Sequence, residues 1–394
     1  MDSLALNIKE MGITDLPDPE EVILTLKGFD PGSDTLKFKE GSKILTGEEI
    51  FPGEHSTVTG TLKSIDSLQV AGGKRVALRI RVAEDEKFDP AIKEVPDFLE
   101  KDPLEILKQL NRCNLKFSEK LAQTKTVVIS AVDTEPLATI QQQILRENKN
   151  RILEGLELIK FLTAAQKVVL AIPKNLDYLV ADIIEDQADV FLVDPVYPNG
   201  LPDILMRTIY YKLGLEACAY LKVEKLFGAV IALKQGRPFV HKVVTIIGNK
   251  ESKNIRIRIG TPIKNLFKDS DIHDNDKLIL GGPLRGDACY STDIPVGDTI
   301  DLVYLQDSSE VILNRNQACI NCGKCVRVCP AELDVNLICR FSEFSHFEEC
   351  LELDVYDCIE CGLCAYHCPS GRSLVQFIRL AKSELEKIEQ EEEK

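Results

Sequence analysis

Residues 319 to 330 read Cys319-Ile-Asn-Cys322-Gly-Lys-Cys325-Val-Arg-Val-Cys329-Pro330. A second stretch repeats the pattern as Cys358-Ile-Glu-Cys361-Gly-Leu-Cys364-Ala-Tyr-His-Cys368-Pro369. In both runs three cysteines are separated by two residues each, a fourth follows after three more, and proline comes next. This spacing places three thiolates on one tight loop, where they can bind three corners of a metal–sulfur cube. The fourth cysteine begins a helix that leads to a second cube, and the proline turns the chain away.

The doubled run predicts two 4Fe–4S clusters, because it is the full pattern of a two-cluster ferredoxin. In that pattern the fourth cysteine of each run binds the cluster of the other run. The expected ligands of the first cluster are Cys319, Cys322, Cys325 and Cys368. The expected ligands of the second cluster are Cys358, Cys361, Cys364 and Cys329. A pair of zinc sites is the alternative, but zinc usually takes two Cys-x2-Cys pairs and has no use for a doubled run closed by proline.

The remaining cysteines favour packing roles. Of thirteen cysteines, eight lie in the two runs, and the absence of a secretory signal argues against a disulfide framework. Cys339 and Cys350 lie in a segment with apolar residues at helical spacing, so we expect them in a core. His367 is expected beside a cluster rather than on it. Ser370 is expected to cap a helix that runs to Leu385, with the charged tail after it frayed.

Composition narrows the class of protein. The chain has 394 residues, 44% of them hydrophobic and 28% charged, which is a globular balance with room for two to four domains. No apolar stretch approaches the roughly 20 residues needed to span a bilayer, so we expect a cytoplasmic protein. The formal charge of −15 and pI near 5.0 argue against nucleic-acid binding.

Ahead of the cysteine runs, three patterns follow one another. Short strands punctuated by glycine from residue 35 to 65 predict a small all-β unit. Its phrase Val58-Thr-Gly-Thr-Leu-Lys63 resembles the sharp turn of lipoyl-like barrel-sandwich domains, but it lacks the lysine in that turn that would carry a lipoyl group. Between residues 100 and 240, helices and buried strands alternate, which predicts an α/β unit with a parallel sheet. The strands expected there are residues 126–130, 167–172 and 190–193, and the helices 103–110, 140–159 and 176–184. Residues 241–305 return to β, with strands expected at 243–248, 255–260 and 277–283.

This order of units resembles the C subunit of the Rnf electron-transport complex, RnfC. Short phrases match as well, among them Asp133-Thr-Glu135-Pro136, Tyr197-Pro198-Asn199-Gly200, Arg258-Ile-Gly260-Thr-Pro262 and Gly281-Gly282-Pro283-Leu-Arg-Gly286. The family is similar to the flavin-bearing subunit of respiratory complex I. The resemblance implies four domains: a barrel-sandwich-like β domain at 1–95, a complex-I-flavoprotein-like α/β domain at 96–240, a β-grasp (SLBB-like) domain at 241–308, and a helical two-cluster ferredoxin-like module at 309–394.

The chain departs from the family where FMN would bind. The resemblance implies a glycine-rich loop between the first helix and first strand of the α/β domain, yet no glycine occurs from Lys74 to Glu154. The loop position reads Leu110-Asn-Arg-Cys113-Asn-Leu-Lys-Phe-Ser-Glu-Lys120. Phosphates need close backbone amides, which bulky side chains obstruct. Ser130-Ala-Val-Asp133 also replaces the family's Asn-Gly-Ala-Glu. We therefore expect neither FMN nor NADH to bind, and we expect Cys113 to pack.

Three functions follow. The leading prediction is a noncatalytic electron-transfer subunit that accepts electrons from a soluble ferredoxin or flavoprotein. It would pass them to other subunits of a redox complex, at the inner face of the cytoplasmic membrane if that complex is membrane-bound, and its acidic surface would dock a basic partner. The second is an NADH:acceptor oxidoreductase that holds FMN through a non-standard loop. The third is a structural subunit whose clusters stabilise its fold.

Overall fold

The computed structural model describes residues 4–7, 9–29, 36–70, 73–163, 165–180, 188–215, 219–248, 251–267, 272–273, 275–311 and 317–392. The chain divides into two compact units. The first consists of Met1–Gly282 and Asp287–Asp307, and the second of Pro283–Gly286 and Ser308–Lys394.

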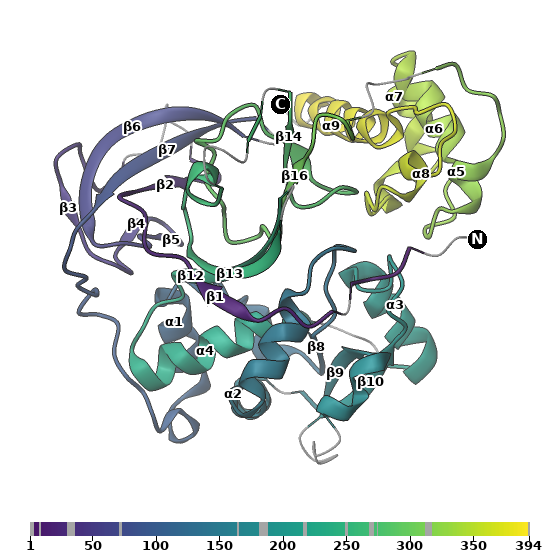
Figure 1. Cartoon of the computed structure of the whole chain (residues 1–394). Helices are drawn as coiled ribbons and strands as arrows, with labels where there is room; N and C mark the ends of the chain where they lie inside the picture. Colours follow the sequence, from purple (N-terminus) through teal and green to yellow (C-terminus); the bar gives the residue numbers. More distant parts are fainter. Residues whose placement is uncertain are drawn as a thin grey trace. The chain divides into compact units, whose positions relative to one another are not determined.

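A twisted antiparallel sheet begins the first unit. Its strand order is β2-β7-β6-β3, and β6 and β7 form a long hairpin (Figure 1). The strands are β2 (Glu21–Thr25), β3 (Lys43–Ile44), β6 (Gly60–Val70) and β7 (Gly73–Val82), with a separate pair β4 (Glu49–Phe51) and β5 (Glu54–His55). Alternating apolar residues such as Leu62 and Ile80 fill one face, as period-two patterning requires. The predicted all-β character is therefore present.

The next layer is a parallel sheet, as the buried strand runs predicted. Its order is β10-β9-β8-β11, and every pair is parallel. The strands are β8 (Thr126–Ser130), β9 (Lys167–Pro173), β10 (Asp189–Val193) and β11 (Ala219–Lys222). All of β8 and all but the first residue of β9 are buried. Continuous burial of this kind is typical of a parallel sheet covered by helices.

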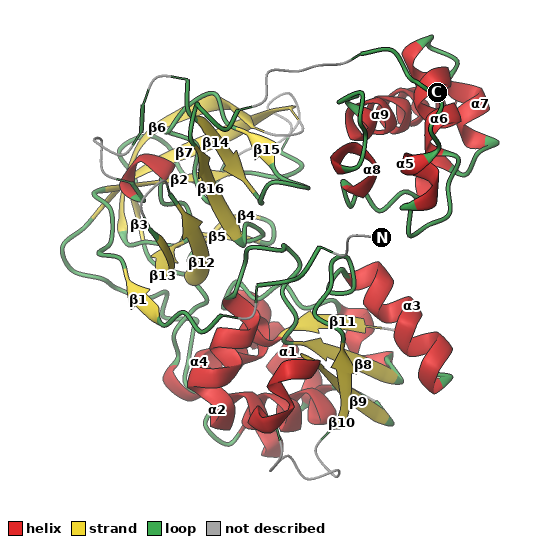
Figure 2. Cartoon of the chain, turned by 45° about the vertical axis from the view of Figure 1, so that its right-hand side comes forward, coloured by secondary structure: helices red, strands yellow, loops and turns green. Residues whose placement is uncertain are grey.

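Four helices accompany this sheet, and α1, α2 and α4 pack together beside it (Figure 2). They are α1 (Pro103–Arg112), α2 (Ile140–Leu162), α3 (Pro202–Leu213) and α4 (Val223–Gln235). Asp102 caps α1, because its side chain accepts from the Leu104 amide. The predicted helix at 176–184 is only partly found: a 3-10 turn covers Lys174–Leu179, and residues 181–187 lie outside the described residues.

A mixed sheet completes the first unit. Its order is β1-β13-β12-β16-β14-β15. The strands are β1 (Ile13–Asp15), β12 (His241–Ile247), β13 (Ser252–Arg258), β14 (Lys277–Leu280), β15 (Asp287–Ala288) and β16 (Leu302–Gln306). The edge strand β1 pairs in parallel with β13. Asp15 and Arg256 lie opposite each other in this register, and their side chains form an ion pair. The sequence did not predict β1.

The second unit is helical, as expected. Its helices are α5 (Lys324–Arg327), α6 (Val335–Glu343), α7 (Phe347–Leu351), α8 (Leu363–Tyr366) and α9 (Leu374–Glu392). Two expectations at its end were wrong. Helix α9 begins at Leu374, so Ser370 lies too early to cap it, and its carbonyl instead accepts from the Gln317 amide. The tail continues α9 to Glu392, supported by the Glu384–Lys387 ion pair.

Candidate functional site

The two cysteine runs fold into the same backbone shape. Gly323 and Gly362 precede the short helices α5 and α8 with φ of 68° and 79°. The residues two positions earlier, Asn321 and Glu360, are also left-handed, with φ of 53° and 51°. A Cβ on Gly362 would lie 2.4 Å from the Leu284 carbonyl oxygen, so glycine is required at that approach. The repeated spacing in the sequence is therefore a repeated loop in space.

Each loop directs a backbone amide at its first cysteine. The Asn321 amide donates to Cys319 Sγ at 3.4 Å, and the Glu360 amide donates to Cys358 Sγ at 3.4 Å. Hydrogen bonds to cluster-ligating sulfur stabilise negative charge and influence the reduction potential. Glu360 is in turn held by Arg379 at 2.7 Å and Lys382 at 3.2 Å.

The eight predicted ligands gather in two groups of four. A cavity of about 490 Å³ is lined by Cys319, Cys322, Cys325 and Cys368, together with Cys339. A smaller one of about 10 Å³ is lined by Cys329, Cys358, Cys361 and Cys364. Four thiols around each space are the donors that a 4Fe–4S cluster uses, so the donor set fits that group. Within the described residues no three His, Cys, Asp or Glu side chains are placed to hold a single metal ion.

The two groups differ in burial. Cys319 and Cys322 are exposed, whereas Cys361 and Cys364 are buried. Burial raises the pKa of Cys361 to about 11 and the pKa of Cys364 to about 12. A 4Fe–4S cluster would bind these side chains as thiolates, so cluster binding here would release protons.

The other cysteines of the second unit are core residues, as predicted. Cys339 and Cys350 are 1% and 0% exposed. The Cys339 thiol donates to the Leu374 carbonyl at 3.3 Å, and the Cys350 thiol donates to the Ile338 carbonyl at 3.5 Å. Cys339 borders the larger cavity, but its hydrogen bond ties it to α9.

In the first unit, the segment expected to replace the flavin loop uses its own amides. The amides of Cys113, Asn114 and Leu115 donate to carbonyls in the last turns of α1. The Phe117 amide donates to the Asn111 side chain at 2.6 Å. A phosphate cradle needs free amides that converge on one point. These four amides are already paired within the segment, so they are not available to a flavin phosphate.

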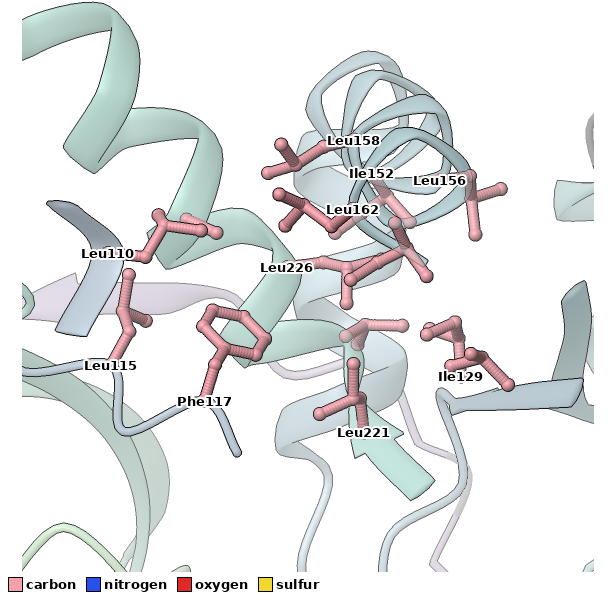
Figure 3. Close-up of a cluster of buried hydrophobic side chains, with 14 of the residues drawn as sticks. Leu110, Leu115, Phe117, Ile129, Ile152, Leu156, Leu158, Leu162, Leu221 and Leu226 are labelled. Carbon is pink, nitrogen blue, oxygen red and sulfur yellow. The ribbon is translucent and has the colours of Figure 1, made fainter. Parts of the chain in front are cut away.

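The side chains of this segment fill a core instead. Leu115 and Phe117 are 3% and 4% exposed and belong to the cluster that contains Leu110 and Leu226 (Figure 3). Cys113 is fully buried, and burial raises its pKa to about 12, which makes it an inert packing thiol. The sequence-based expectation of packing for Cys113 is confirmed.

The start of α2 is also occupied by the chain itself. Asp133, which follows β8, accepts from the amides of Ile140 and Gln141 at 2.8 and 2.9 Å. The Gln142 side chain donates to its second oxygen at 3.2 Å. Burial raises the pKa of Asp133 to about 6. A carboxylate at this helix start takes the place that an anion would need.

The polar residues of the same loop border a different space. Asn114 and Lys116 line a cavity of about 550 Å³ whose other walls come from the β-sheets. Lys116 pairs there with Glu54 at 2.9 Å and Asp298 at 3.5 Å. The one cation that the loop contributes is therefore already neutralised.

A buried ion network went unnoticed in the sequence. Asp301 pairs with Lys222 and, at 3.2 Å, with Lys242, whose side chain is 0% exposed. Lys242 also donates to the Asp298 carbonyl at 3.0 Å. The available signal was a lysine inside a mostly apolar strand, His241-Lys-Val-Val-Thr-Ile-Ile247. The network ties β11, β12 and the segment before β16 together.

Comparison with known families finds two domains. Residues 112–227 match the Nuo51 FMN-binding domain, and residues 318–372 match a 4Fe–4S dicluster domain. The fold and the cysteine-lined cavities thus define an iron–sulfur protein that also contains a domain of the complex I flavoprotein type.

The relatives specify the resemblance further. The chain is 28% identical over 378 residues to the C subunit of the ion-translocating oxidoreductase complex of Vibrio cholerae, covering 86% of this chain and 49% of that protein. It is 26% identical over 414 residues to the Yersinia enterocolitica protein of the same name, covering 95% and 59%. The chain is therefore RnfC-like, as its sequence predicted, and spans about half the length of these relatives.

A solved structure is also similar. The NAD+-reducing NiFe hydrogenase in its air-oxidised state aligns with a TM-score of 0.45 and 14% identity, over 69% of this chain and 57% of that chain. Among the described residues no helix is long and apolar enough to cross a membrane.

Proposed function

We propose that this chain is an iron–sulfur electron-transfer subunit of an Rnf-like redox complex, without an FMN or NADH site of its own. The proposal rests chiefly on one observation: the second unit gathers eight cysteines in two groups of four. Its first cluster is held by Cys319, Cys322, Cys325 and Cys368. Its second cluster is held by Cys358, Cys361, Cys364 and Cys329. When bound, such clusters carry single electrons.

The chain's own residues supply position and electrostatics. Amides of Asn321 and Glu360 donate toward cysteine sulfur, and Arg379 and Lys382 fix the second loop through Glu360. The paired amides of the segment after α1 argue against a flavin phosphate. The relatives are named as a subunit of an ion-translocating oxidoreductase complex, which supports partners that are other subunits of such a complex. A ferredoxin or flavoprotein as donor, and a peripheral position on the cytoplasmic side of the membrane, belong to the same proposal. Four domains, at 1–95, 96–240, 241–308 and 309–394, belong to the same proposal.

The test is an anaerobic absorbance titration of the cluster-replete protein, first with NADH and then with dithionite, combined with flavin analysis after denaturation. We expect bleaching of the iron–sulfur band by dithionite alone and no released flavin. Bleaching by NADH together with stoichiometric FMN would overturn the proposal in favour of an NADH:acceptor oxidoreductase.

A second experiment, with cysteine variants, distinguishes electron transfer from a purely structural role of the clusters. Cys322→Ser is expected to remove the first cluster while the complex still assembles, and electron flow through the complex should fall. Matched Cys289→Ser, outside both cysteine groups, should change neither iron content nor electron flow. Unchanged electron flow in the assembled Cys322→Ser complex would leave the clusters a structural role only.

A further inference from the structure

The two cysteine groups differ in their access to a partner protein. Ile320, between two cysteines of the first run, is 67% exposed, and its neighbours Cys319 and Cys322 are also exposed. In the second run, Cys361 and Cys364 are each 7% exposed. Interprotein electron transfer requires close approach of the redox centres. The first run is therefore the one that offers its centre to another protein.

An apolar rim surrounds the first group. Ile320, Leu337 and Phe344 line the larger cavity and are 67%, 36% and 66% exposed. Apolar side chains gathered on one exposed face are more typical of an interaction site than of free surface. They come from the first cysteine loop, from α6 and from the residue that follows α6.

The charge on this face is opposite to that of the whole chain. The whole chain has a formal net charge of −15. Lys324, Arg327 and Arg340 are exposed around the first run, and within the described part of the chain none of the three forms an ion pair. Among the described residues that line the cavity, Glu343 is the one acid, and Arg372 neutralises it at 2.5 Å. The described charged side chains that line this cavity are therefore basic on balance.

The second run provides an internal comparison. In the repeated pattern, Leu363 occupies the position of Lys324, and Tyr366 that of Arg327. Both runs build the same loop, as their matching backbone angles show. The two cations are therefore not needed for the loop shape, and they occur only on the run that is open to solvent.

We propose that the face formed by Ile320, Lys324, Arg327, Leu337, Arg340 and Phe344 docks an acidic electron-carrier protein. The partner is one whose redox centre is surrounded by Asp and Glu side chains, with a small apolar contact at its middle. This inference rests on the proposed function and adds the kind of partner and the face it uses. It reverses, for this face, the expectation of a basic partner drawn from the net charge. Opposite charges around an apolar centre would orient the encounter and accelerate it.

The test measures binding rather than turnover, with both proteins oxidised and anaerobic. The probe is an acidic plant-type 2Fe–2S ferredoxin, and basic cytochrome c is the comparison. The dissociation constant is measured by calorimetry from low to high salt, with cluster-replete full-length protein. We expect preferential binding of the ferredoxin, weakening as salt rises.

Charge reversal identifies the face. Lys324→Glu with Arg340→Glu is expected to weaken ferredoxin binding by about tenfold or more and to flatten the salt dependence. The control, Lys108→Glu with Lys277→Glu, makes the same change in net charge at exposed positions in the first unit and should shift binding by about twofold at most. Phe344→Ala should weaken binding at low and high salt alike, because it removes apolar contact.

Three results would overturn the docking proposal: equal weakening by both double variants, tighter binding of cytochrome c, or binding that is indifferent to all these substitutions. Iron content and the dithionite-reduced electron paramagnetic resonance spectrum must match the parent protein, which confirms that the variants keep their clusters. Failure of the proposed function would appear in a different measurement, as bleaching of the iron–sulfur band by NADH together with released FMN. The dissociation constants for the ferredoxin would not be affected by that result.

Discussion

At the scale of single residues, the buried Asp301 is the counter-charge for two lysines, the buried Lys242 and the partly exposed Lys222. Burial by itself raises the pKa of this carboxyl, but the charges and hydrogen bonds of Lys222 and Lys242 outweigh burial and lower the pKa to about 2. The same pairing raises the pKa of Lys222. A buried charge that loses its partner is far more costly than the pair itself is stabilising. The free energy of unfolding should therefore depend on Asp301 more than on any surface ion pair.

Asp301→Asn should lower the free energy of unfolding of the first unit by about 3–5 kcal/mol at pH 7. The folded pKa of Asp301 lies below its ordinary value of 3.8, so its contribution is complete above about pH 4. It is lost as the pH falls from there toward 2. The difference between the parent and the variant should accordingly shrink across that window.

Buried Cys113 offers a readout in the first unit itself. Its modification by dithiodipyridine in increasing urea, followed peptide by peptide with mass spectrometry, reports when that core opens. Asp298→Asn, at a half-exposed neighbour that binds Lys242 through its carbonyl, is the matched control and should cost much less. A constant difference between Asp301→Asn and the parent from pH 7 to pH 3 would contradict the assigned ion network.

At the scale of elements, the sequence predicts what is locally encoded. The buried strand at 126–130 appears with the same bounds, because a continuous β-branched run has one favourable environment. Strand β1 has only three residues and is fixed by its parallel pairing with β13, far along the chain. The spacing of the cysteines in the sequence likewise predicted the two groups of four that line the two cavities. The partners Lys242 and Asp301 could not be paired in advance, because only the folded sheet brings them together.

The segment after α1 has become a packing element, and Phe117 tests that conclusion. Phe117→Ala should lower the free energy of unfolding by about 3–5 kcal/mol, since the side chain is 4% exposed and a cavity would remain. It should not create flavin binding, because the surrounding amides stay paired. Urea unfolding followed through Cys113 gives the first quantity, and FMN fluorescence quenching the second. Exposed Leu104→Ala, on α1, is the control and should be nearly neutral.

A gain of micromolar FMN binding by Phe117→Ala would contradict this interpretation. It would mean that the loop retains a phosphate cradle which one aromatic ring obstructs. Loss of stability without flavin binding would instead support a segment that now serves the core.

At the scale of the whole molecule, the two units have different sources of stability. The first unit contains a large apolar core around the parallel sheet. The second has a smaller core, in which Cys364 is a member and four other predicted ligands pack at the edge. Ligand side chains in a core cannot reach their final packing without their metal, so iron binding should be part of folding there.

Removing iron should therefore unfold the second unit selectively. In hydrogen–deuterium exchange with mass spectrometry, the iron-free full-length protein should lose protection in α6 and α9 by about tenfold or more, while β8 and β9 keep theirs. Restoring the clusters should return protection. The Cys322→Ser protein should show a partial loss centred on α5 and α6, and Cys289→Ser none. Equal loss of protection in both units would mean that they fold as one cooperative body, and unchanged α6 and α9 would mean that their apolar core suffices without iron.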